Sequence, residues 1–145
     1  MVQVVEVTDR AAVGALITMP EYFKPTRTLN ADDVVWSFQR QLDPNHPCHS
    51  LSLVGFPYFE SMGFKDLLKS VEKVDDLTVK ITLNKAESPF LTDVAMPFTS
   101  IYSAEYADQL LKSGKTAELN SKPIGTGPFI FVRGVWPWQW SNRKR

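Results

Sequence analysis

The stretch KSVEKVDDLTVKITLN, residues 69–84, predicts a β-hairpin and therefore an antiparallel sheet in the fold. In its second half, Val79, Ile81 and Leu83 alternate with polar residues, which is the period of a strand with one buried face. Asp75-Asp76-Leu77 is a polar turn between the two halves. The two β-rich runs are residues 69–74 and 78–84.

A helix is expected before the hairpin, from Ala31 to Leu42. Asn30 is a favourable N-cap, and Pro44 ends the helix because proline disfavours helical geometry in the residue before it. The apolar residues that share one side of this helix are expected to be buried, namely Val34, Val35, Phe38 and Leu42. The polar residues are expected to face solvent, namely Asp33, Ser37, Arg40 and Gln41.

The other segments mix short helical and extended patterns, without the regular strand and helix alternation of a parallel sheet. Extended segments are predicted over Val2–Val7, Phe98–Tyr102 and Phe129–Val132, and a short helix from the Ser88-Pro89 cap to Ala95. A further helix is predicted over Ala104–Lys112, with Ser103 as N-cap, Gly114 as stop and Tyr106, Leu110 and Leu111 facing inward. The aromatic loop, residues 45–63, should contain short helical turns. The fold class is α+β, with a β-hairpin and three short helices.

Composition excludes several classes of function. With 145 residues, 16 Lys+Arg against 16 Asp+Glu and 43% hydrophobic residues, the chain is expected to fold as one globular unit. Zero net charge argues against a nucleic-acid binder, and the single cysteine, Cys48, excludes an internal disulfide. No stretch reaches the roughly 20 apolar residues of a membrane span, and residues 1–20 lack the pattern of an export signal.

Three possible metal ligands lie within four residues, at His46, Cys48 and His49. Zinc sites usually need a second ligand pair at a distance, and the chain has no other histidine or cysteine. We therefore expect an ordinary loop, with no metal and no cofactor. A small metal-dependent hydrolase that uses these three residues stays open as an alternative.

Two carboxylate pairs look like catalytic dyads, but each has a structural explanation. Asp32-Asp33 falls in the first turn of a helix, where negative charge is favourable, and Asp75-Asp76 falls in a hairpin turn. Gly125-Thr126-Gly127 lacks the lysine and the following helix of a phosphate loop, so a turn is expected there. We predict no catalytic residue and no enzyme activity.

The C-terminal segment, residues 134–145, is rich in tryptophan and ends in a basic run. Trp136, Trp138 and Trp140 stand close to Arg143, Lys144 and Arg145. Aromatic side chains interleaved with cations can stack on single-stranded nucleic acid. An interaction module that uses this tail is a second alternative, although the neutral chain argues against nucleic acid as its partner.

Four segments in a fixed order carry a resemblance to a known family. They are FKPTRTLNADDVVWSF (23–38), VEKVDDLTV (71–79), AESPFL (86–91) and PIGTGPF (123–129). With these motifs the chain resembles the dipeptide-binding members of the family 5 bacterial solute-binding proteins, over residues 22–133.

The resemblance implies a periplasmic receptor that captures peptides in a cleft between two lobes and delivers them to an ABC permease. Some relatives take haem instead. The implied fold is part of a periplasmic-binding-protein type II-like fold, mainly its small accessory domain. The residues that grip the peptide termini are implied to lie in the second lobe, so no ligand-binding residue is assigned. Tyr58 and Phe98 fall in segments that could approach the cleft, but both are equally good packing residues.

Residues 1–21 and 134–145 do not match the family motifs, which suggests a truncated or frameshifted reading frame. We expect such a fragment to expose the edge of the strand at residues 129–132 and to self-associate through it. Its relatives are implied to be periplasmic, whereas a chain without a leader is expected to stay in the cytoplasm.

Overall fold

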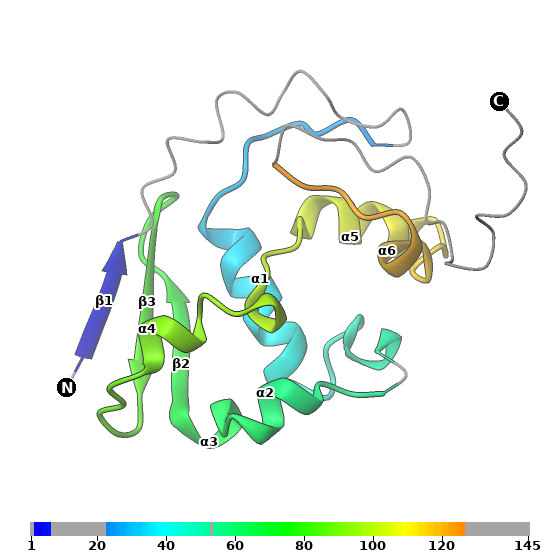
Figure 1. Cartoon of the computed structure of the whole chain (residues 1–145). Helices are drawn as coiled ribbons and strands as arrows, with labels where there is room; N and C mark the ends of the chain where they lie inside the picture. Colours follow the sequence, from blue (N-terminus) through cyan, green and yellow to red (C-terminus); the bar gives the residue numbers. More distant parts are fainter. Residues whose placement is uncertain (1, 7–22, 53, 127–145) are drawn as a thin grey trace, which may run out of the picture.

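The computed structural model describes residues 2–6, 23–52 and 54–126, the first of these ranges by its backbone alone (Figure 1). A sheet lies on one side of the central helix α1, and helices α5 and α6 lie on the other side. The elements in chain order are β1 (Val2–Glu6), α1 (Ala31–Leu42), η2 (His49–Leu51), α2 (Pro57–Ser61), α3 (Phe64–Leu67), β2 (Leu68–Lys73), β3 (Thr78–Leu83), α4 (Phe90–Asp93), η3 (Pro97–Thr99), α5 (Ala104–Lys112) and α6 (Glu118–Ser121). This mixture confirms the α+β class, and η2 and α2 confirm the short helical turns predicted over residues 45–63. Helices α3 and α6 are single turns beyond the predicted ones.

The described sheet is antiparallel and has the strand order β1-β3-β2. The predicted hairpin is confirmed, because β2 and β3 pair with Val71 opposite Ile81. Strand β1 pairs with the other side of β3, with Val4 opposite Lys80, so the N-terminal strand is confirmed as well. The buried residues of the hairpin are Leu68, Val71, Val79, Ile81 and Leu83.

Helix α1 begins at the predicted residue because its first turn is firmly capped. The side chain of Asn30 accepts a hydrogen bond from the backbone N–H of Asp32 (3.0 Å), and the side chain of Asp33 accepts one from the backbone of Asn30 (2.9 Å). The N–H of Ala31 donates to the carbonyl of Asp76 at 2.9 Å. The start of the helix is therefore attached to the turn of the hairpin.

The larger hydrophobic core lies between α1, the sheet and the short helices α2 to α4. Phe59, Phe64 and Phe90 are its largest fully buried side chains, with ring centres 5.3 Å apart for the first two and 6.0 Å apart for the last two. Burial of each phenylalanine stabilises the fold by about 1.5–3 kcal/mol. Helix α1 contributes Val34 and Phe38, so the predicted apolar side of this helix does face the core.

A smaller core lies on the opposite side of α1. It joins the chain before α1 to α5 and α6, and it consists of Phe23, Tyr106, Ala107, Leu110 and Leu119. The rings of Phe23 and Tyr106 are 5.0 Å apart. Trp36 of α1 packs against this core, so α1 is sandwiched between two apolar layers.

The polar side of α1 is buried, and the expectation that it faces solvent is wrong. Asp33, Ser37 and Arg40 are 1%, 3% and 4% exposed, and Gln41 is half-buried. The hydroxyl of Ser37 donates to the carbonyl of Asp33 (2.7 Å) and accepts from the N–H of Tyr102 (2.8 Å). The chain leading into α5 therefore covers the helix face that a surface helix would leave open, and it supplies the partners that buried polar groups require.

Three local predictions are wrong. Helix α4 begins at Phe90 with Pro89 as its N-cap, so Ser88 is not the cap, and the helix ends at Asp93. Residues 98–102 form no strand, because the hydroxyl of Thr99 bonds to preceding carbonyls and supports the η3 turn instead. Leu111 is 42% exposed and does not face inward.

Helix α5 is confirmed together with both of its end signals. The hydroxyl of Ser103 accepts from the N–H of Tyr106 at 3.2 Å, and Gly114 has a φ of +68°, the left-handed geometry that glycine tolerates after a helix. The strand at residues 129–132 and the tryptophan-rich tail lie outside the described residues. Within the described ranges, no helix has both the length and the apolar content to cross a bilayer.

Candidate functional site

The most unusual side chain in the described structure is Arg40, a cation buried near the end of α1. Its Nε donates to the backbone carbonyl of Cys48 at 3.0 Å. Its guanidinium carbon lies 4.9 Å from the ring centre of Tyr102 and 5.6 Å from that of Phe56, so the charged plane is held between two aromatic rings. Among the described residues, no carboxylate pairs with Arg40 and no acceptor bonds to its two terminal nitrogens.

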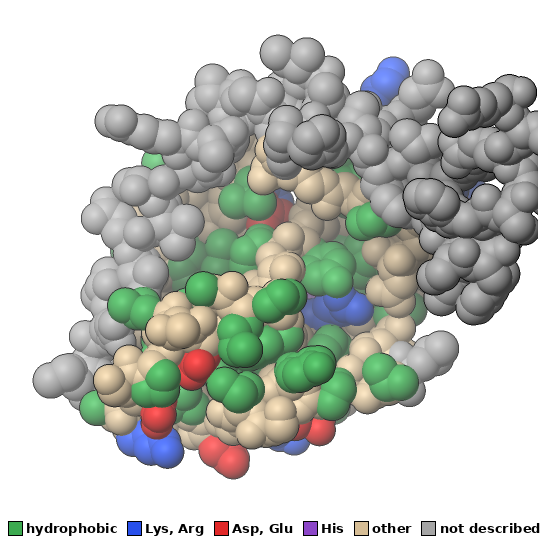
Figure 2. All heavy atoms as spheres, in the orientation of Figure 1, with side chains coloured by type: hydrophobic (Ala, Val, Ile, Leu, Met, Phe, Trp, Pro, Cys, Tyr) green, Lys and Arg blue, Asp and Glu red, His purple; other side chains and the backbone are tan. Residues whose placement is uncertain are grey.

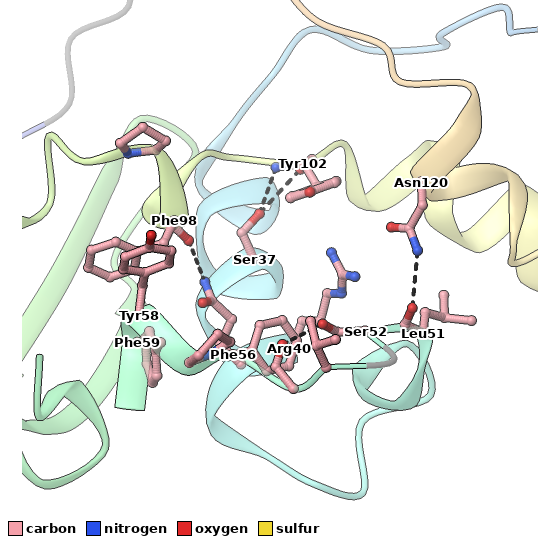
Figure 3. A pocket seen from close by; sticks show the side chains of 15 residues that line it. Ser37, Arg40, Leu51, Ser52, Phe56, Tyr58, Phe59, Phe98, Tyr102 and Asn120 are labelled. Atoms are coloured by element: carbon pink, nitrogen blue, oxygen red, sulfur yellow. Dashed lines mark hydrogen bonds between the residues drawn. The ribbon is translucent and has the colours of Figure 1, made fainter. Parts of the chain in front are cut away.

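A pocket of about 430 Å³ opens beside this guanidinium. Figure 3 shows the terminal nitrogens of Arg40 pointing into the space between Tyr102 and Asn120. Figure 2 shows the same face hollowed, with a basic side chain on the floor of the hollow and apolar side chains around it. The described residues that line the pocket are Ser37, Arg40, Gln41, Leu51, Ser52, Val54, Gly55, Phe56, Pro57, Tyr58, Phe59, Pro97, Phe98, Tyr102 and Asn120.

Polar side chains around the pocket hold its walls in place. Gln41 Nε2 donates to the carbonyl of Phe98 at 3.1 Å, which attaches α1 to η3. Asn120 Nδ2 donates to the carbonyl of Leu51 at 3.0 Å, which attaches α6 to η2. These contacts link segments 57 and 69 positions apart in the chain, so the pocket is a product of the tertiary fold.

Tyr58 and Phe98, which the family resemblance implied could approach a cleft, both line this pocket. Tyr58 is 69% exposed at the rim, whereas Phe98 is half-buried and packs against the larger core. Sequence reasoning missed Arg40, which it assigned to solvent. Asp33, Ser37 and Arg40 are four and three positions apart, so they share one helix face, and this polar stripe could have drawn attention to the site.

The three possible metal ligands lie in the loop behind Arg40, and each has a local role. His46 Nδ1 accepts from the N–H of Cys48 at 3.2 Å, and His49 Nδ1 lies 2.7 Å from the carbonyl of Arg40, to which it donates. Burial lowers the pKa of His46 and raises the pKa of the Cys48 thiol. No group of three or more His, Cys, Asp or Glu side chains in the described ranges is arranged to hold a metal ion.

The carboxylate pairs are occupied by structural contacts. Asp33 forms two hydrogen bonds with the guanidinium of Arg27, at 2.6 and 2.9 Å, and this contact raises the pKa of Arg27. Lys73 Nζ lies 2.8 Å from Asp32 and 2.7 Å from Asp76, and the hydrogen bond to Lys73 lowers the pKa of Asp32.

The remaining candidates from the sequence are Asp75 and the segment Gly125-Thr126-Gly127. Asp75 accepts from the N–H of Leu77 at 2.8 Å, as expected for a turn, and this bond lowers the pKa of Asp75. Gly125 and Thr126 line a second cavity of about 360 Å³ next to Arg27 and Asp33, and Gly127 lies outside the described residues.

Comparison with known proteins identifies the family. The family model described as "Bacterial extracellular solute-binding proteins, family 5 Middle" matches residues 22–141. The chain belongs to this family. The resemblance drawn from the four sequence motifs is therefore confirmed.

Two curated relatives are similar to the chain through most of its length. Di/tripeptide-binding protein 4 of Pseudomonas aeruginosa (strain UCBPP-PA14) is 66% identical over 120 residues, which are 83% of this chain and 22% of that protein. Heme-binding protein A of Haemophilus influenzae (strain ATCC 51907 / DSM 11121 / KW20 / Rd) is 64% identical over 110 residues, which are 76% of this chain and 20% of that protein.

A solved structure is similar in fold as well as in sequence. The structure of HbpA2 from Haemophilus parasuis superposes with a TM-score of 0.83 and 54% identity, and the match covers 94% of this chain and 26% of that one. The chain thus spans about a fifth to a quarter of the length of the relatives it matches.

Proposed function

We propose that this chain is part of the solute-binding component of an ABC importer that captures short peptides outside the cytoplasmic membrane. The observation that carries the proposal is the 66% identity over 120 residues to a di/tripeptide-binding protein. In this role the protein is a receptor and not an enzyme. It binds the peptide by its backbone and terminal charges, in a periplasmic cleft between two lobes, and passes it to a permease.

In this proposal, the described residues form a rigid accessory domain of the receptor. The two apolar cores, the contact of Arg27 with the buried carboxylate of Asp33 and the capped start of α1 favour a single conformation. A cleft between two lobes needs both lobes to enclose a peptide. We therefore propose that the 145-residue chain alone has negligible affinity for dipeptides.

Haem is a second candidate ligand, because a relative named for haem binding is 64% identical over 110 residues. Peptide and haem make different demands on a receptor. A peptide needs groups that pair with its terminal charges, whereas a haem needs a large apolar slot and an axial ligand to iron. The two ligands are therefore separated by direct titration.

The experiment is a domain exchange followed by calorimetry. Residues 22–141 replace the matching segment of the Pseudomonas di/tripeptide-binding protein 4, and the chimera is titrated with the dipeptide Met-Leu and separately with haem. The proposal expects Met-Leu affinity within about tenfold of the parent protein, and no detectable heat with the isolated chain. A folded chimera that binds no peptide, or micromolar binding by the isolated chain, would contradict it.

A further inference from the structure

The guanidinium of Arg40 is largely buried, and its two terminal nitrogens reach solvent only through the pocket, where no described group bonds to them. Arginine is almost never fully buried unless it is paired, because removal of a charge from water is costly. Arg40 is 4% exposed, yet among the described residues only the carbonyl of Cys48 accepts from it, and that bond uses Nε. The two terminal nitrogens face a pocket of about 430 Å³. We infer that this pocket binds a small carboxylate, with the carboxylate on the terminal nitrogens of Arg40 and an apolar body against the aromatic walls.

The geometry of the cation selects a carboxylate. A guanidinium presents parallel N–H groups that match the two oxygens of a carboxylate, and the rings of Tyr102 and Phe56 fix its plane before any ligand arrives. Arg40 is the single charged side chain among the described residues that line the pocket. One positive charge balances a monoanion, whereas a phosphate dianion would remain half-neutralised.

The size and lining of the pocket describe the rest of the ligand. A volume of about 430 Å³ lies within the range of small-molecule sites and is much larger than one aspartate or glutamate side chain requires. Three of the walls are Phe56, Tyr58 and Phe98, which suit a ring or a branched alkyl group. The same lining contains no carboxylate for a ligand amine, so a zwitterion such as phenylalanine or a dipeptide is disfavoured relative to a simple carboxylate.

This inference does not depend on peptide capture, because every residue named above belongs to the described part of this one chain. A pocket between α1, α2, η3 and α6 needs no second lobe. A chimera that fails to bind dipeptides would therefore leave the carboxylate site standing, and the reverse also holds.

The test uses the 145-residue chain and the probe 3-phenylpropionate. Calorimetry and two-dimensional NMR should show saturable binding, with shifts at the side-chain amide signals of Gln41 and Asn120. The neutral analogue 3-phenylpropionamide and zwitterionic phenylalanine should bind at least about tenfold more weakly, since each lacks a net charge to pair with Arg40. Three results would overturn the proposal. The amide could bind as tightly as 3-phenylpropionate, the NMR shifts could be confined to residues of the cavity beside Arg27, or binding could fail to saturate at millimolar 3-phenylpropionate.

Variants separate the role of the charge from the stability of the fold. R40Q should abolish binding, and R40K should weaken it about tenfold because an ammonium lacks the planar pair of donors. Y58A keeps Arg40 and alters a rim residue that is 69% exposed, so it should fold normally and bind about fivefold more weakly through loss of one wall. The matched control K65Q removes an exposed charge on α3 and should bind as the parent does. Full binding by folded R40Q would refute the assignment. Full binding by both single variants, Y58A and R40K, would refute it as well.

Discussion

The Oδ1 atom of Asp33 accepts a hydrogen bond from the backbone N–H of Ala104 at 2.8 Å, across 71 positions of the chain. The same carboxylate receives two bonds from Arg27 and one from the backbone of Asn30. A single buried side chain in the first turn of α1 therefore holds the segment before α1, the start of α1 and the start of α5 together.

Replacement of Asp33 by asparagine should lower the free energy of unfolding by about 2–3 kcal/mol, because it leaves Arg27 without its anion and weakens charge-assisted hydrogen bonds. Urea denaturation at pH 7 measures the change. D32N is the control, since the neighbouring carboxylate is half-exposed and solvent screens its pair with Lys73, so its loss should lower the free energy of unfolding much less. Equal losses of unfolding free energy in D33N and D32N would show that burial of Asp33 does not strengthen its contacts.

Replacement of Ser37 by alanine should cost about 0.5–1.5 kcal/mol of stability, because the N–H of Tyr102 loses the hydrogen bond to the buried hydroxyl of Ser37. Thermal unfolding followed by circular dichroism measures this loss. S100A removes an exposed hydroxyl of the same type and should change stability by less than about 0.5 kcal/mol. A stability of S37A equal to that of S100A would contradict the proposed role.

Stability should fall as the pH is lowered through the titration of His46. Burial holds the folded-state pKa of His46 below its ordinary value of 6.5, so the unfolded chain takes up this proton first. The contribution of neutral His46 to the free energy of unfolding is fully present above pH 6.5 and is lost as the pH falls through the lower folded-state pKa. In H46N, whose amide oxygen can still accept from the N–H of Cys48, urea unfolding should depend less on pH between 7.5 and 5.5. An unchanged dependence would exclude His46 as its source.

Replacement of Phe64 by alanine should cost about 3–5 kcal/mol, because this ring is fully buried and its loss leaves a cavity among Phe59, Phe90 and Phe98. V74A is the control, since Val74 is 59% exposed after the end of β2 and should change stability by less than about 0.5 kcal/mol. Guanidinium unfolding compares the two variants. A small loss in F64A would mean that the core collapses into the space.

The sequence predicted elements whose signals are local. The hairpin followed from strict alternation at Val79, Ile81 and Leu83, and α5 followed from Ser103 at its start and Gly114 at its end. The prediction of the buried side of α1 was also correct at Val34 and Phe38. In each case the signal lies within about one turn or one strand of the feature that it determines.

The polar side of α1 and the pocket were not predicted, because their partners lie far away in the chain. A helix pattern gives the apolar face but does not say whether a second layer covers the polar one. Asp33 and Ser37 are satisfied by backbone groups of Ala104 and Tyr102, and Arg40 lies between Phe56 and Tyr102. Only the folded chain brings these groups together.

The position of α1 between two apolar layers also bears on how the protein opens. Because both the sheet and α5 pack against this helix, neither layer can separate from it without exposing one side of α1 to solvent. The amide protons in the middle of α1 should accordingly exchange with deuterium only when the whole fold is lost, whereas those of α6 and the tip of the hairpin exchange through smaller local openings. The described elements are thus arranged around one central helix, and we expect the sheet and α5 to unfold together with it.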